Sequence, residues 1–152
     1  MYRFAVGLAL LGVLVVGVSS SSATPGVGGP WDRASGAGKV LNQDRFFNVS
    51  AQNGPQGVNG HITLDTGPAR AKADVNCLIV VGNTARVGGT VTKSNDPSFP
   101  EGQPIAIYLQ DNGSPGKDND LFDAHRTPCT NPLIDQNARP LESGNVVVNS
   151  AL

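Results

Sequence analysis

Short runs in which apolar and polar residues alternate recur along the chain after residue 38. This alternation is typical of a half-buried strand, whereas an amphipathic helix places apolar residues three and four positions apart. No stretch beyond Val18 keeps the helical spacing for more than one turn. The alternating apolar positions are Phe47, Val49 and Ala51; Ile62 and Leu64; Val75, Cys77, Ile79 and Val81; Ala85, Val87 and Val91; Ile105, Ile107 and Leu109; and Val146 and Val148. The chain is therefore predicted to form strands almost throughout.

Turn-forming residues separate these runs. Gly82-Asn83 alone divides two of them, which predicts a tight β-hairpin. The chain holds 19 Gly and 11 Pro, and both residue types disfavour helix interiors. Parallel strands also need crossover helices, which this pattern lacks. We predict an all-β fold, a single antiparallel sandwich or small barrel of about seven or eight strands, and the pattern does not choose between these two.

The central hairpin carries two finer expectations. Strict alternation places Val75, Cys77, Ile79 and Val81 on one face of their strand. Gly88-Gly89 lies inside the next strand, where glycine indicates a bulge or a close approach of another backbone.

The N-terminus has the order of residues of a secretory signal peptide. Arg3 is followed by an unbroken apolar and glycine run from Phe4 to Val18, and then by small polar residues. This run of about fifteen residues is shorter than the roughly 20 that a membrane-spanning helix needs. Small side chains at Ser21 and Ala23 predict cleavage after Ala23. We therefore expect residues 1–23 to be a signal peptide and the protein to be secreted, with no membrane span in the mature chain.

The remaining sequence divides into two parts. Residues 24–37 are rich in glycine and poor in apolar residues apart from Trp31, so we expect a flexible leader that becomes ordered near Trp31 or after it. Residues 38–152 form the predicted antiparallel β domain. The net charge of the whole chain is only −1, so no basic footprint for nucleic acid or an anionic membrane is present.

Cys77 and Cys129 form an even pair in a chain that we expect to be exported. An oxidising compartment favours a disulfide between them, tying the central hairpin to the loop before the last strand. Closing a loop of this size would stabilise the fold by about 3–4 kcal/mol. Two alternatives remain open: Cys77 as a buried free thiol, and a zinc site that combines both cysteines with His61 and His125.

An acidic stretch, DNGSPGKDNDLFD, runs from residue 111 to 123. Asp111, Asp118, Asp120 and Asp123 offer carboxylates to a calcium ion, which takes six to eight oxygen ligands. Asn and Gly in the same stretch also form turns, and its charges would then lie in water. We favour the polar turn, with calcium as the alternative and no other cofactor expected. Asn substitutions at Asp118 and Asp120 would then be nearly neutral.

Several motifs resemble those of a group of small exported bacterial proteins. They are Gly60-His61-Ile62, the stretch VNCLIVVGNTARVGGTVT, the DNG turn, the second cysteine and the closing GNVVV. The group is all-β and has no established activity. The resemblance therefore implies a β fold and export, and it implies no catalytic residues.

Signatures of common enzymes are missing from the sequence, including the G-x-S-x-G elbow, the H-E-x-x-H helix and phosphate-binding glycine loops. We expect a secreted, non-catalytic β-domain protein that acts at the cell surface or in the medium. A calcium-dependent adhesion or carbohydrate-binding module is the alternative, and a small hydrolase is a weaker one. The sequence identifies no partner.

Overall fold

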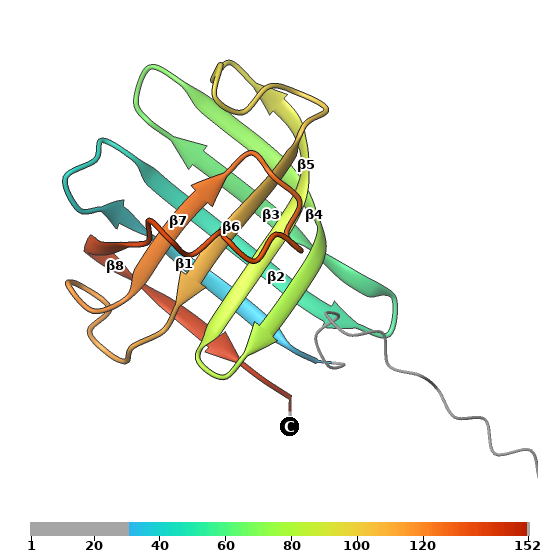
Figure 1. Ribbon diagram of the computed structural model, residues 1–152, viewed down its shortest axis with the longest axis vertical. Coiled ribbons are helices and arrows are strands. Elements are labelled where there is room, and N and C mark those ends of the chain that lie inside the picture. Colours follow the sequence, from blue (N-terminus) through green and yellow to red (C-terminus); the bar gives the residue numbers. More distant parts are fainter. Residues whose placement is uncertain (1–30, 152) are drawn as a thin grey trace, which may run out of the picture.

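The computed structural model describes residues 31–151, which form eight β-strands and no helix. The strands are β1 (Arg33–Val40), β2 (Phe46–Gly54), β3 (Gly57–Asp65), β4 (Arg70–Val81), β5 (Thr84–Ser94), β6 (Pro104–Gln110), β7 (Leu121–His125) and β8 (Arg139–Asn149). Each pairs antiparallel with the next, and β8 pairs with β1 to close a barrel (Figure 1). The all-β prediction is confirmed, and closure decides for the barrel. No helix in the described range is long and apolar enough to cross a membrane.

The barrel interior is filled by the inward-facing members of the alternating runs. Phe47 and Phe122 of this core stack on each other, with ring centroids 4.2 Å apart. Aliphatic side chains such as Ile62, Leu64 and Ile107 surround them and are almost completely buried. Burial of apolar area stabilises a fold by about 25 cal/mol per Å², so the side chains of this core stabilise the barrel.

Strand β4 departs from the predicted alternation. Val75 pairs with Gly89 but Cys77 pairs with Gly88, so Asn76 is an extra residue that forms a bulge. A bulge shifts the side-chain phase by one residue. Val75 therefore faces the barrel core, whereas Cys77 and Ile79 face outward. The prediction of one common face was wrong, because it assumed an unbroken strand.

A second, smaller core lies outside the barrel. The segment between β7 and β8, residues 126–138, which we call the cover loop, crosses the outer face of the barrel (Figure 1). Its Cys129 and Ile134 pack with Ile79, Ala106 and Tyr108. These residues are all at most 8% exposed, so the outer face of β4 and β6 is dry beneath the cover loop.

The predicted disulfide joins Cys77 of β4 to Cys129 of the cover loop. Gly88 lies directly beneath this contact, and a Cβ at its position would lie 2.3 Å from the Cys129 Cβ. A Cβ at Gly89 would lie 2.0 Å from the Asp74 carbonyl oxygen, so the predicted close approach of another backbone is confirmed at Gly89, and the bulge lies opposite it in β4. The two thiols are bonded to each other and are not zinc ligands.

Strand β1 begins at Arg33, shortly after Trp31, near which the leader was expected to become ordered, and before residue 38, where the predicted β domain begins. Ala34 is completely buried and pairs with both β2 and β8. The small residues are needed for packing, because a Cβ at Gly38 would lie 2.2 Å from the Ser143 carbonyl oxygen. Local composition resembled a linker, but pairing on both sides orders it. The predicted signal peptide, residues 1–23, lies outside the described residues.

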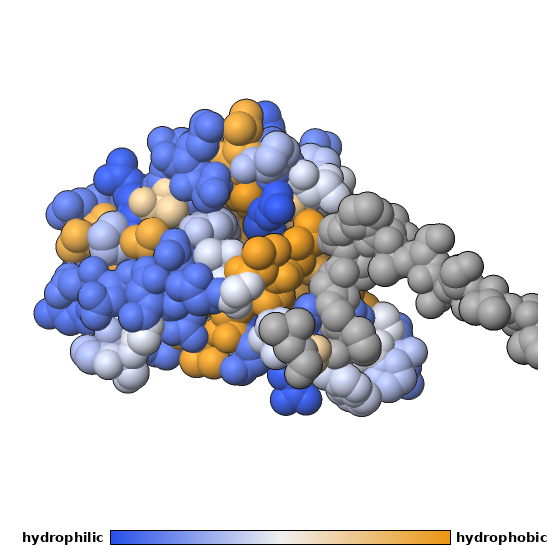
Figure 2. All heavy atoms as spheres, turned by 60° about the horizontal axis from the view of Figure 1, so that its bottom comes forward, coloured by the Kyte–Doolittle hydropathy of each residue, from blue (hydrophilic) through white to orange (hydrophobic). Residues whose placement is uncertain are grey.

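The two barrel ends differ in character. At the end that holds the β2–β3 and β4–β5 turns, the partly buried Val58, Val80 and Val148 close the core. Figure 2 turns this end toward the viewer and shows hydrophobic residues gathered at its middle, with hydrophilic residues around them. The opposite end holds the β3–β4 turn and the loop between β5 and β6, where charged side chains gather.

Candidate functional site

The four aspartates of the acidic stretch point to different partners. Asp120 is fully buried, and its two carboxylate oxygens accept hydrogen bonds from the Asn112 and Val146 backbone N–H groups at 2.9 and 2.7 Å. Asp111 accepts from the Gly113 and Val148 backbone N–H groups at 3.0 and 3.2 Å.

Asp118 and Asp123 do not share these hydrogen-bond partners. Asp123 contacts the Ala124 backbone N–H and the His125 ring. Asp118 is exposed and has a positive φ of 63°. Among residues 31–151, no three His, Cys, Asp or Glu side chains lie close enough to hold a metal ion. The geometry therefore does not support the calcium alternative.

Asp111 and Asp120 instead complete the closure of the barrel. Strand β7 is short, and only two of its residues pair with β8. Beyond that point the N–H groups of Val146 and Val148 have no strand to bond, and a buried donor needs an acceptor. The two carboxylates supply it, so we call Asp111 and Asp120 the aspartate latch. The expectation that Asp120 lies in water was wrong, because sequence alone does not show that β7 begins only at Leu121.

Millimolar calcium should change the melting temperature by no more than about one degree, because an ion that does not bind the native state does not stabilise it. Thermal unfolding with calcium and with magnesium checks this. A rise of several degrees with calcium alone would contradict it and restore the acidic stretch as a cation site.

The two histidines of the zinc alternative, His61 and His125, contact residues other than the cysteines. The Nε2 atom of His61 lies 3.1 Å from Asn48 Oδ1, and that of His125 lies 2.8 Å from Asp123 Oδ2. With both cysteines oxidised, the predicted ligand set does not form.

A basic hollow lies at the end of the barrel that holds the β3–β4 turn. It has a volume of about 390 Å³ and is lined by Arg70, Lys72, Lys93, Ser94, Asn95 and Glu101. Its lining side chains carry three positive charges and one negative charge. Sequence reasoning did not single out any of these residues.

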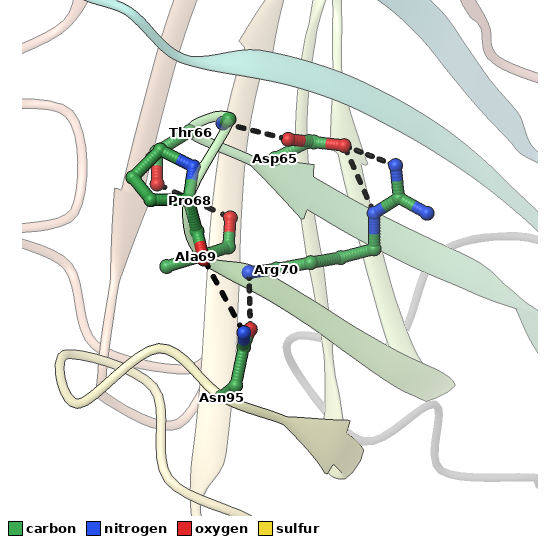
Figure 3. Close-up of polar contacts among 7 residues, drawn as sticks. Asp65, Thr66, Pro68, Ala69, Arg70 and Asn95 are labelled. Carbon is green, nitrogen blue, oxygen red and sulfur yellow. Dashed lines mark hydrogen bonds and ion pairs between the residues drawn. The ribbon is translucent and has the colours of Figure 1, made fainter.

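The rim of the hollow is tied down by a hydrogen-bond network (Figure 3). Asn95 Oδ1 accepts from the Arg70 backbone N–H at 2.6 Å, and Asn95 Nδ2 donates to the Pro68 carbonyl at 3.3 Å. The Arg70 guanidinium donates from Nε and Nη2 to Asp65 Oδ2. The hydrogen bond from Arg70, with a further one from the Gly67 backbone N–H, lowers the pKa of Asp65 below its ordinary value. Arg70 is thus neutralised and held in place.

Two lysines that line the hollow have no acidic partner within residues 31–151. Lys72 of β4 and Lys93 of β5 are direct cross-strand partners, and both are exposed. Within residues 31–151, neither ammonium group forms an ion pair or a side-chain hydrogen bond. Glu101 Oε1 accepts from the Ser94 backbone N–H at 2.9 Å, and no ion pair joins Glu101 to either lysine.

One sequence signal could have found this pair. Lys72 lies ten residues before Gly82, and Lys93 lies ten residues after Asn83. Counting outward from a two-residue turn therefore places them opposite each other. The count holds because the register shift at Asn76 is cancelled by a second shift at Thr92.

Comparison of the chain with protein-family models, with curated proteins and with solved structures finds no significant match. Any function proposed for the chain therefore depends on its own residues.

Proposed function

We propose that the protein is an exported, non-catalytic β-barrel binding protein that recognises an anionic ligand at the basic hollow. The observation that carries the proposal is the Lys72–Lys93 pair. Like charges directly opposite on neighbouring strands destabilise a sheet. A bound anion between the two ammonium groups would turn this repulsion into attraction.

The chemistry of the hollow indicates the class of ligand. Lysine ammonium groups act as point charges with several donors, so they suit phosphate, sulfate or carboxylate groups. The rigid rim limits the conformational entropy lost on binding. A volume of about 390 Å³ accommodates one anionic group together with part of the molecule that carries it.

Titration with a multivalent anion tests the proposal. Citrate and a sulfated oligosaccharide, added separately at low ionic strength, should raise the melting temperature by several degrees, because ligands that bind only the native state stabilise it by mass action. The stabilisation should fall with added sodium chloride, since salt screens exposed charges. The two probes distinguish a small carboxylate ligand from a sulfated glycan.

The Lys72→Gln/Lys93→Gln variant should lose this response. It should also be as stable as the parent or slightly more stable in the absence of anion, by up to about 1 kcal/mol, because the cross-strand repulsion is gone. Lys117→Gln is the matched control, since Lys117 is exposed and does not line the hollow. An equal response to anions in parent and double variant would overturn the proposal, as would the absence of any response in the parent.

A further inference from the structure

A second hollow lies at the opposite end of the barrel, the end turned toward the viewer in Figure 2. It has a volume of about 290 Å³ and is formed by Trp31, Arg33 and the β2–β3 hairpin end with Gln52, Asn53, Gln56 and Asn59. We call it the amide hollow. It shares no residue with the basic hollow, so a ligand at the amide hollow would not depend on the proposed anion binding.

The indole of Trp31 is the outstanding feature of the amide hollow. Trp31 is the only tryptophan in the chain, and it is 56% exposed. Leaving so large an apolar ring in water forgoes the stabilisation that burial would provide. Its backbone has a φ of 77°, which is uncommon for a bulky residue.

The backbone on both sides of Trp31 is nevertheless held firmly. The Trp31 N–H donates to the Asn53 carbonyl at 2.7 Å, and the Asn53 N–H donates to the Asp32 carbonyl at 2.9 Å. Asp32 is 2% exposed, and its Oδ1 accepts from the Ala151 N–H at 2.8 Å. The β1–β2 ladder thus extends to the tryptophan, which places the ring against the β2–β3 hairpin.

Uncharged amides supply the polar part of the hollow, with Arg33 as its single charged residue. Gln52 Nε2 donates to Asn59 Oδ1 at 3.2 Å, which orients both side chains. A side-chain amide offers donors and acceptors together, which matches a hydroxyl group, itself donor and acceptor. An exposed aromatic face beside several amides therefore suits a ligand with an apolar face and a rim of hydroxyls.

We propose that the amide hollow binds a neutral saccharide. The C–H groups on one face of a pyranose ring would stack on the negative face of the Trp31 indole. The hydroxyls at the ring edge would exchange hydrogen bonds with the side chains of Gln52, Gln56 and Asn59. Because a single aromatic ring and a hollow of about 290 Å³ bury little area, we expect a dissociation constant in the high micromolar to millimolar range.

Tryptophan fluorescence gives a direct test, since all tryptophan emission comes from Trp31. The protein purified after export is titrated with soluble oligosaccharides of β-1,4-glucose, β-1,4-N-acetylglucosamine and α-mannose. At least one of them should shift the emission to shorter wavelength in a saturable manner. Calorimetric titration of the same saccharide with the Trp31→Ala variant should show affinity lowered about tenfold or more, because the stacking face is gone.

The Gln56→Ala variant keeps the indole and tests the amides separately. Gln56 is exposed at the hairpin end, so the variant should fold normally and bind the saccharide several-fold more weakly. The Lys72→Gln/Lys93→Gln variant should bind it like the parent, which separates this site from the basic hollow. Failure of every saccharide in the panel to change the emission would overturn the proposal. Binding that survives Trp31→Ala unchanged would overturn it as well.

Discussion

The Cys77→Ser/Cys129→Ser variant should lose about 3–4 kcal/mol of unfolding free energy and still form the barrel. The disulfide closes a separation of 52 residues, so its loss frees a long loop in the unfolded chain. The barrel core contains neither cysteine, because both belong to the second core outside it. Denaturant unfolding followed by circular dichroism measures the loss, with an unchanged β spectrum in the absence of denaturant.

The cover loop should loosen in the same variant. Trypsin should cleave after Arg126, which is exposed near the start of the loop, faster than in the parent protein. A variant that resists trypsin as well as the parent would contradict a clamping role for the disulfide.

Tyr108 provides a second measure of this loosening. Burial beneath the cover loop, and then the negative charge of Asp135, raise the pKa of the Tyr108 phenol above its ordinary value. The fold thus favours the neutral phenol. The resulting contribution to the free energy of unfolding is fully present below the ordinary tyrosine pKa of about 10, and it is lost as the pH rises through the raised pKa of Tyr108 in the folded protein. Absorbance titration of tyrosinate should give a lower pKa for Tyr108 in the double serine variant than in the parent.

The Asp120→Asn variant should lose about 2–4 kcal/mol of unfolding free energy, although it preserves the size of the side chain. The Asp120 carboxylate accepts two backbone N–H bonds, one from each oxygen. Asparagine has one acceptor oxygen and one donor amide, so its NH₂ group would face a backbone donor. One buried N–H is then left without an acceptor at the seam between β7 and β8.

Asp118→Asn is the matched control, since it makes the same chemical change two residues away. Asp118 is exposed, and asparagine tolerates its positive φ, so the substitution should stay within about 0.5 kcal/mol of the parent. Equal stability of the two variants in denaturant unfolding would contradict the aspartate latch. A seam weakened by Asp120→Asn should also show faster amide exchange at Val146.

The features predicted correctly from sequence all depend on neighbours along the chain. Alternation with period two, the Gly82-Asn83 turn and the double glycine each act within a few residues, so they predicted strands, the central hairpin and a close approach. The disulfide was predicted from the even number of cysteines and from the oxidising compartment expected for an exported chain, and neither argument depends on the fold. The same local reasoning failed at Asn76, because a bulge leaves no residue-type signal that distinguishes it from a continuing strand.

The candidate sites were accessible to sequence reasoning to different degrees. The Lys72–Lys93 pair could be counted from the hairpin register, but the hollow around it needs the β3–β4 turn and the loop between β5 and β6. The amide hollow needs Trp31 and the start of β1 at Arg33, whereas composition predicted only that the chain becomes ordered near Trp31 or after it and predicted no strand there. Aspartates are usually solvated, so nothing local indicated that Asp120 is buried.

The sequence by itself determined that this chain forms short antiparallel strands and that its cysteines pair, because period, turns and redox chemistry act locally. Only the tertiary structure decided that the strands close into a barrel and that a loop covers its outer face. It also decided that two aspartates bond to β8 beyond the point where β7 begins. The reason is that a buried backbone N–H group needs an acceptor wherever its neighbouring strand is missing. The extent of each strand depends on contacts between segments that are distant in the sequence.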